Sequence, residues 1–137
     1  MQATKPQTLA YGLFDSPAGL AGWIVEKLRA WSDCDGDVER RFTLDDVLTH
    51  VTLYWVTNMI GTSFGPYFER ETPGNERPAI PTAVTLFARD LIPAPRAFAD
   101  RIFDVRRWTE LPRGGHFGAW EEPELFAGEL RAFAAEL

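Results

Sequence analysis

Two apolar runs in the second half of the chain, residues 80–87 and 105–111, are its strand candidates. The first run does not alternate cleanly between apolar and polar positions, which is typical of a parallel strand buried on both faces. A short helix is predicted between the runs, from Pro95 to about Phe103, and another helix after the second run. This order predicts a βαβα unit with a right-handed crossover.

Two strands do not make a self-sufficient parallel sheet. Both faces of such a sheet need cover, and each unpaired edge leaves backbone N–H and C=O groups without partners. The first half of the chain is predicted to hold helices but no strands. We therefore expect either that another chain supplies strands or that this sequence is a piece of a larger α/β fold.

The first predicted helix begins at Ser16-Pro17, a capping serine followed by a proline at the first helical position. Apolar residues then recur at helical spacing as far as Trp31. Residues 1–15 are predicted to be irregular, and the polar residues 32–41 to form a surface loop.

That loop resembles the start of a calcium-binding loop, because three aspartates alternate with other residues: Asp33, Asp35 and Asp37. The twelfth position, however, holds Leu44 in place of glutamate, and Gly36 stands fourth rather than sixth. We therefore expect no calcium site here. No group of Cys and His residues has the spacing of zinc ligands either.

A second helix is predicted to start at the capping-box pair Thr43 and Asp46 and to continue towards Ile60. His50 lies off its apolar stripe and is expected at the surface. Residues 71–78 then have the composition of a linker.

Charge and composition exclude several classes of function. The net charge of −6 disfavours a nucleic-acid partner, whose phosphates require a basic surface. The single cysteine, Cys34, excludes an internal disulfide. No apolar run has the length of a transmembrane helix, and the N-terminus does not have the pattern of a signal peptide. We therefore expect a soluble, cytoplasmic protein.

A glycine-rich loop between the second strand and the last helix carries a histidine, His116, preceded by Gly114 and Gly115. Pro123 suits the first turn of the helix that follows. Held in this way, a histidine can act as a general base, because its unperturbed pKa lies near neutrality. The alternative is a loop histidine that only caps or packs.

Asp90 follows the first strand candidate as His116 follows the second. Neighbouring parallel strands bring their carboxyl ends together, so we expect the two side chains to be close. An acid followed along the chain by a histidine is the order at the end of an α/β-hydrolase triad. Asp104 and Glu110 are rival acids, but both lie within the second strand region.

Several stretches spread over nearly the whole chain share the pattern of one family. They are Thr4-Lys5-Pro6, Tyr11-Gly12-Leu13-Phe14-Asp15-Ser16-Pro17-Ala18-Gly19-Leu20-Ala21, Phe42-Thr43-Leu44-Asp45-Asp46-Val47-Leu48, Tyr54-Trp55, Arg113-Gly114-Gly115-His116-Phe117 and Glu121-Glu122-Pro123-Glu124-Leu125. On these stretches the sequence resembles the C-terminal part of the microsomal-type epoxide hydrolases, including the juvenile-hormone epoxide hydrolases. The resemblance implies a partial α/β-hydrolase fold, with the rest of a helical lid in residues 1–72 and the last two strand–helix units in residues 78–137.

The resemblance also implies roles for three residues. His116 matches the base that activates the hydrolytic water, and Asp90 stands where the family places its triad acid, usually a glutamate. Tyr67, twelve residues past Trp55, matches a lid tyrosine that donates a hydrogen bond to the epoxide oxygen. Three other aromatic residues compete for that role: Tyr54, Phe64 and Phe68.

The family's remaining machinery lies upstream of the matched stretches. Its aspartate nucleophile, its oxyanion hole and a second lid tyrosine have no counterpart here, and the chain is expected to begin inside the lid. The full reaction converts a small apolar epoxide to a diol through an aspartyl ester, without cofactor or metal. The isolated chain is therefore expected to be inactive. The alternative is a non-catalytic binding or assembly module that self-associates or needs a partner chain.

Overall fold

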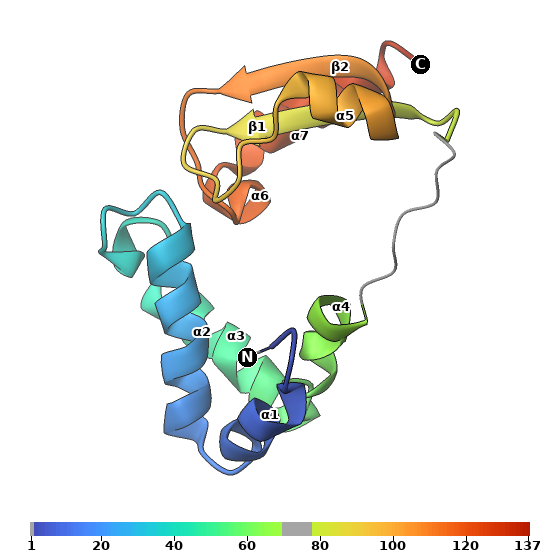
Figure 1. Cartoon of the computed structure of the whole chain (residues 1–137). Coiled ribbons are helices and arrows are strands. Elements are labelled where there is room, and N and C mark those ends of the chain that lie inside the picture. Colours follow the sequence, from blue (N-terminus) through green and yellow to red (C-terminus); the bar gives the residue numbers. More distant parts are fainter. Residues whose placement is uncertain (1, 70–77) are drawn as a thin grey trace. The chain divides into compact units, whose positions relative to one another are not determined.

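The computed structural model describes residues 2–69 and 78–137 and divides them into two compact units (Figure 1). Residues 2–29 and 37–69 belong to the first unit, and residues 30–36 and 78–137 to the second. Residues 32–36 of the predicted surface loop 32–41, together with the last two residues of the helix before it, thus pack with the second unit. Within the two described ranges, no helix combines the length and apolar character needed to span a membrane.

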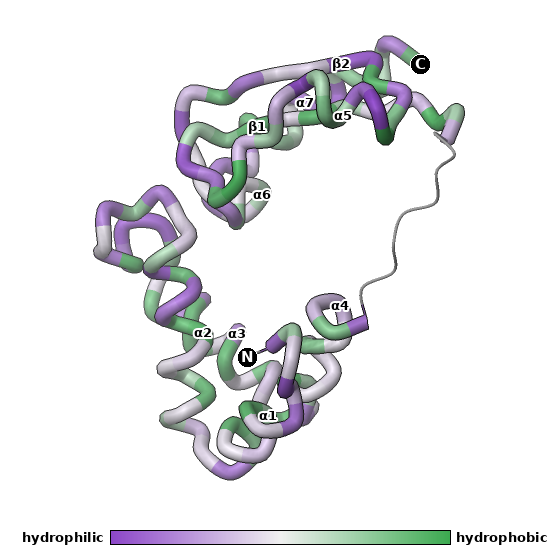
Figure 2. Tube along the Cα trace, in the orientation of Figure 1, coloured by the Kyte–Doolittle hydropathy of each residue, from purple (hydrophilic) through white to green (hydrophobic). Residues whose placement is uncertain are grey.

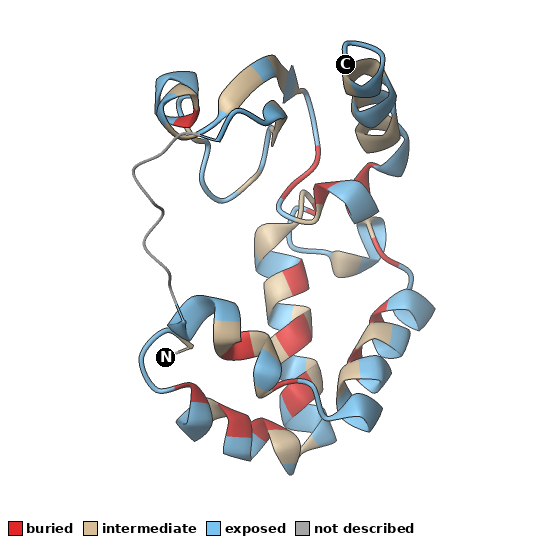
Figure 3. Cartoon of the chain, turned by 90° about the vertical axis from the view of Figure 1, so that its right-hand side faces the viewer, coloured by how far each residue is buried: buried red, intermediate tan, exposed pale blue. Residues whose placement is uncertain are grey.

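The first unit is built from helices. They are α1 (Pro6–Phe14), α2 (Pro17–Trp31), α3 (Leu44–Thr57) and α4 (Gly65–Phe68), with 3-10 turns at Val38–Arg40 and Thr62–Phe64. Leu20, Leu28 and Phe64 are almost fully enclosed, and buried positions recur along the helices at intervals of about one turn (Figure 3). The ring of Trp23 meets Phe64 edge-on, with 6.2 Å between the ring centroids.

Two helix starts confirm the sequence prediction. The Ser16 Oγ accepts a hydrogen bond of 2.9 Å from the Gly19 N–H at the start of α2. At α3, Thr43 and Asp46 form a reciprocal capping box. The helix α3 ends at Thr57, because Asn58 adopts the left-handed conformation with φ 54°.

Two expectations about the first unit were wrong. Residues 6–14 are helical rather than irregular, since Pro6 preorganises the first turn and Ala10 and Leu13 bury one side of the helix. His50 is half-buried rather than at the surface, with its ring centroid 5.1 Å from that of Tyr54. Burial lowers the pKa of the His50 imidazole, because it penalises the charged form.

The second unit follows the predicted order of strand, helix, strand and helix. It contains β1 (Pro81–Phe87), α5 (Arg96–Ile102), β2 (Asp104–Leu111), a short α6 (Gly118–Glu121) and α7 (Pro123–Ala134). The strands pair in parallel, from Pro81 opposite Asp104 to Phe87 opposite Leu111, with an irregularity between Thr82 and Ala83. In Figure 1, α5 lies in front of this sheet and α7 behind it.

The strand β1 is only partly buried, although its apolar sequence is typical of a strand covered on both faces. Pro81 is exposed and the other six residues of β1 are half-buried. The reason is the size of the sheet: with two strands, β1 has one neighbour and little cover, although its residues are largely apolar (Figure 2). An apolar strand sequence therefore overestimates burial in a sheet this small.

Ionic hydrogen bonds fasten α7 to β2. The Arg107 guanidinium donates to Glu129 at 2.8 and 3.2 Å and to Glu136 at 2.7 Å. The Thr109 hydroxyl also donates to Glu129, at 2.7 Å. The bonds from Arg107 and Thr109 lower the pKa of the Glu129 carboxyl, and those to Glu129 and Glu136 raise the pKa of Arg107.

Candidate functional site

The carboxyl ends of the two strands bring together two side chains singled out in the sequence. The register ends at Phe87 opposite Leu111, so the segments after β1 and β2 leave the sheet side by side. There the His116 Nδ1 lies 3.0 Å from the Asp90 Oδ1, within hydrogen-bond distance. The expectation that these side chains are close is met, while their catalytic roles stay a prediction.

The acid is itself held in place. The Asp90 Oδ1 accepts a hydrogen bond of 2.7 Å from the Leu91 N–H, and the Asp90 N–H donates to the Phe87 carbonyl at 3.1 Å. One residue earlier, the Arg89 N–H donates to the Gly114 carbonyl at 2.9 Å, which ties the segment after β1 to the histidine loop. The Asp90–His116 pair therefore lies on two segments that a backbone hydrogen bond holds together.

Aromatic rings surround one side of the histidine. The ring centroid of His116 lies 5.4 Å from that of Trp31 and 5.3 Å from that of Phe117, both edge-on. The side chains of His116 and Asp90 remain 41% and 33% exposed. With Nδ1 turned to a carboxylate, the imidazole can keep Nε2 as the nitrogen that accepts a proton from water.

The backbone of the histidine loop is bound by residues that sequence reasoning missed. Glu121, 8% exposed, accepts hydrogen bonds of 3.0 Å from the N–H groups of both Gly115 and Phe117. The His116 N–H donates to the Trp31 carbonyl at 2.8 Å. The only sequence signal was the place of Glu121 in a family-like stretch, because its contacts depend on the folded loop.

The two glycines of the loop are required by its shape. Gly114 has φ +94°, where a side chain would be strained, and a Cβ there would lie 2.6 Å from the Phe87 ring. A Cβ on Gly115 would lie 2.6 Å from the Trp31 carbonyl oxygen. The loop and the segment 30–36 are thus in direct backbone contact.

The two other candidate acids, Asp104 and Glu110, interact with residues other than His116. The Asp104 carboxylate pairs with Arg106 at 2.9 Å, and the Glu110 Oε1 accepts from the Trp108 indole N–H at 3.3 Å. Asp90 is therefore the carboxylate that contacts the histidine.

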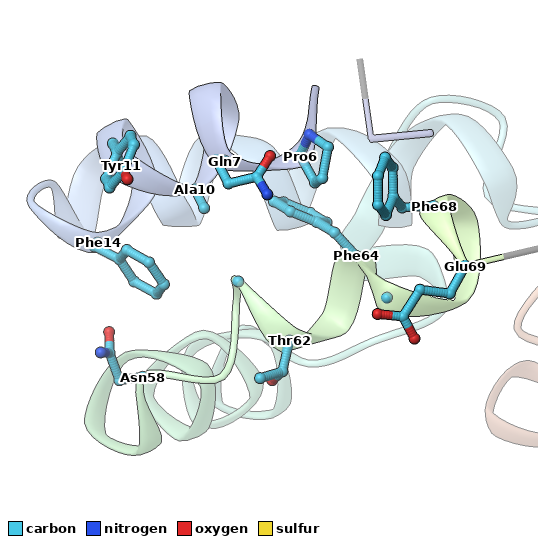
Figure 4. Close-up of a pocket in the computed structure, with 12 residues that line it drawn as sticks. Pro6, Gln7, Ala10, Tyr11, Phe14, Asn58, Thr62, Phe64, Phe68 and Glu69 are labelled. Atoms are coloured by element: carbon cyan, nitrogen blue, oxygen red, sulfur yellow. The ribbon is translucent and has the colours of Figure 1, made fainter. Parts of the chain in front are cut away.

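Tyr67 lies in α4 of the first unit and is 39% exposed, and its role stays a prediction. Among its rivals, Phe64 is buried and Tyr54 packs beside His50. Phe68 lines a pocket of about 650 Å³ between α1 and the segment from Asn58 to Glu69 (Figure 4).

The aspartates of the segment that resembled a calcium loop have protein partners. The Asp33 Oδ2 accepts from the Gly114 N–H at 3.1 Å, and the Asp37 Oδ1 caps a 3-10 turn through the Glu39 N–H. Among residues 2–69 and 78–137, no group of three or more His, Cys, Asp or Glu side chains is arranged to hold a metal ion.

The fold is that of part of an α/β-hydrolase, and its two parallel strands present Asp90 and then His116 at their carboxyl ends. No family model matches the chain. It is 37% identical to epoxide hydrolase 1 of Sus scrofa and 33% identical to juvenile hormone epoxide hydrolase 1 of Ctenocephalides felis. These alignments cover 97% and 95% of this chain but 32% and 31% of the relatives.

The solved structures that resemble this chain are also epoxide hydrolases. The chain superposes on juvenile hormone epoxide hydrolase from the silkworm Bombyx mori with a TM-score of 0.88 and 34% identity, over 98% of this chain and 38% of that one. For the Aspergillus niger epoxide hydrolase the TM-score is 0.81 at 29% identity. That superposition covers 98% of this chain and 34% of the Aspergillus niger chain. The chain is therefore homologous to epoxide hydrolases, juvenile hormone epoxide hydrolases among them, and spans about a third of the length of the relatives it matches.

Proposed function

We propose that this chain is the C-terminal part of a microsomal-type epoxide hydrolase, in which His116 activates the water that completes the reaction. One observation carries the proposal: the His116 Nδ1 lies 3.0 Å from the Asp90 Oδ1 at the carboxyl ends of two parallel strands. Homology to epoxide hydrolases over nearly the whole chain indicates which reaction such a pair would serve.

The chemistry follows from this pair. A carboxylate attacks an oxirane carbon and the ring C–O bond breaks. The freed ring oxygen takes a proton from the Tyr67 phenol, which regains one from solvent, and a hydroxy ester of the diol forms. Asp90 then accepts the Nδ1–H of His116, which leaves Nε2 unprotonated to take a proton from water. The resulting hydroxide attacks the ester carbonyl, the bond between the acyl carbon and the diol oxygen breaks, and that oxygen takes the proton back from the His116 Nε2. The diol and the free carboxylate are thus released. A small apolar epoxide is the proposed substrate class.

We also propose which groups contact the epoxide oxygen and where the nucleophile and the oxyanion hole come from. Tyr67 donates a hydrogen bond to the epoxide oxygen, a role that suits a partly exposed phenol in the lid. The nucleophile and the oxyanion hole are assigned to no residue of this chain. We propose that the part of the enzyme that corresponds to the other two thirds of its relatives supplies them.

A chimera tests this function. The matched third of the silkworm enzyme is replaced by this chain, and diol formation from an epoxide is measured. We expect turnover that His116→Gln lowers by about 100-fold or more, as for loss of a general base, while His50→Gln preserves it. Equal turnover with and without His116 would refute the assignment. The 137-residue chain alone should form no diol from styrene oxide.

The alternative, a non-catalytic assembly module, is favoured by one observation: the apolar residues of β1 are only half-buried. Such a strand can pair with strands of a partner chain. A folded chimera that binds the epoxide but forms no diol would support this alternative.

A further inference from the structure

The loop that carries His116 offers four consecutive backbone N–H groups, and all four donate hydrogen bonds. Their acceptors are the Asp33 Oδ2 for Gly114, the Glu121 Oε2 for Gly115, the Trp31 carbonyl for His116 and the Glu121 Oε1 for Phe117, at 3.1, 3.0, 2.8 and 3.0 Å. A loop held at every N–H has little freedom to change its backbone angles. The position of the histidine is therefore set by these acceptors.

Glu121 is the centre of this arrangement. Besides the two loop N–H groups, its Oε2 accepts a hydrogen bond of 2.7 Å from the Asp33 N–H. Asp33 in turn accepts from the Gly114 N–H, so the carboxylate joins the loop and the segment 30–36. Burying a carboxylate is costly unless its oxygens are satisfied, and here three backbone N–H groups satisfy them.

We propose that Glu121 is the positioning residue of His116. By holding the N–H groups on both sides of the histidine, it keeps Nδ1 on Asp90 and Nε2 available for the water. This inference rests on the proposed function of His116. A displacement of about 1 Å at a catalytic group is enough to lower a rate strongly, so such a restraint bears directly on the reaction.

The neighbouring Glu122 provides a matched control. It is 7% exposed, close to the 8% of Glu121, and carries the same charge. Its carboxylate, however, pairs with the Arg113 side chain at 2.8 Å rather than with the N–H groups that flank the histidine. Charge removal at Glu122 should therefore leave the histidine geometry intact.

The test uses nuclear magnetic resonance on the whole 137-residue chain. The chain has two histidines, so His50→Gln identifies the ring signals of His116. Two properties are measured in Glu121→Gln and Glu122→Gln: the ring 15N shifts of His116, which report which nitrogen is protonated, and the hydrogen exchange of the Gly115 and Phe117 amides.

In Glu121→Gln one acceptor oxygen becomes an NH₂ donor, so an N–H group of the loop loses its partner. We expect exchange at Gly115 or Phe117 to accelerate about tenfold or more, as for loss of a bond to a charged acceptor. The His116 ring shifts should move towards those of a reference variant, Asp90→Asn, which lacks the carboxylate that faces Nδ1. Glu122→Gln should match the wild type in both measurements.

A folded Glu121→Gln with wild-type ring shifts would overturn the proposal, and so would equal changes in Glu122→Gln. If Glu121→Gln does not fold, Glu121→Asp is measured in its place. The aspartate keeps the negative charge but is too short to reach the same N–H groups, so wild-type ring shifts of His116 in Glu121→Asp would also overturn the proposal. None of these measurements needs turnover. An inactive chimera would thus refute the proposed function without refuting this inference.

Discussion

Replacing Gly115 by alanine tests whether the histidine loop packs on the backbone of the segment 30–36. The added Cβ would lie 2.6 Å from the Trp31 carbonyl oxygen and 2.8 Å from both the Asp33 nitrogen and the Ser32 Cα. All three are backbone atoms, so no side-chain rotation can relieve the clash. The segments must separate, which breaks the bond from the His116 N–H to Trp31 and the bond from the Asp33 N–H to Glu121.

The expected cost follows from these two hydrogen bonds. One has a neutral acceptor and the other a charged one, so together they contribute about 2–4 kcal/mol. Alanine restricts the unfolded chain more than glycine does, which offsets about 0.4–1 kcal/mol. We therefore expect Gly115→Ala to lower the free energy of unfolding of the second unit by about 1–3.5 kcal/mol, or its Tm by roughly 5–25 °C.

The control is the same substitution elsewhere in the second unit. Gly128 lies inside α7, and a Cβ there would meet nothing within 4 Å. Gly128→Ala should stabilise the chain by up to about 1 kcal/mol through helix propensity. Thermal and urea unfolding followed by circular dichroism, with hydrogen exchange of the Phe117 amide, measure both variants. Equal stability of Gly115→Ala and the wild type would refute the close backbone packing of the loop.

Three other predictions concern pH and association. Since the pKa of Glu129 is lowered in the folded chain, its stabilisation is present above the usual carboxyl range and lost as pH falls through the lowered pKa. Glu129→Gln should thus lower the free energy of unfolding at neutral pH but not in strong acid. Urea unfolding of the variant and the wild type at each pH measures this difference. The lowered pKa of His50 predicts a free energy of unfolding that declines as pH falls below about 6.5, and a smaller decline in His50→Gln; equal declines in the two proteins by urea unfolding would contradict this. Because β1 is only half-buried, we expect the chain to self-associate or to bind a hydrophobic dye; a monomer by sedimentation that binds no dye would contradict this.

The sequence by itself determined the features that depend on neighbouring residues. The capping pair Thr43 and Asp46, and Ser16 before Pro17, mark helix starts because their hydrogen bonds span three residues along the chain. The order of strand, helix, strand and helix implied parallel pairing. That pairing is enough to bring Asp90 and His116 together from positions 26 residues apart.

Only the tertiary structure decided which residues hold the histidine in place. Glu121 and Asp33 are 88 residues apart, and no local pattern indicates that one accepts a hydrogen bond from the other. The polar residues 32–41 were expected at the surface because polarity indicates contact with water, yet the Asp33 carboxylate among them accepts a hydrogen bond from the backbone of the histidine loop. A polar side chain can be satisfied equally well by water or by a distant N–H group, and only the folded chain determines which of these it meets.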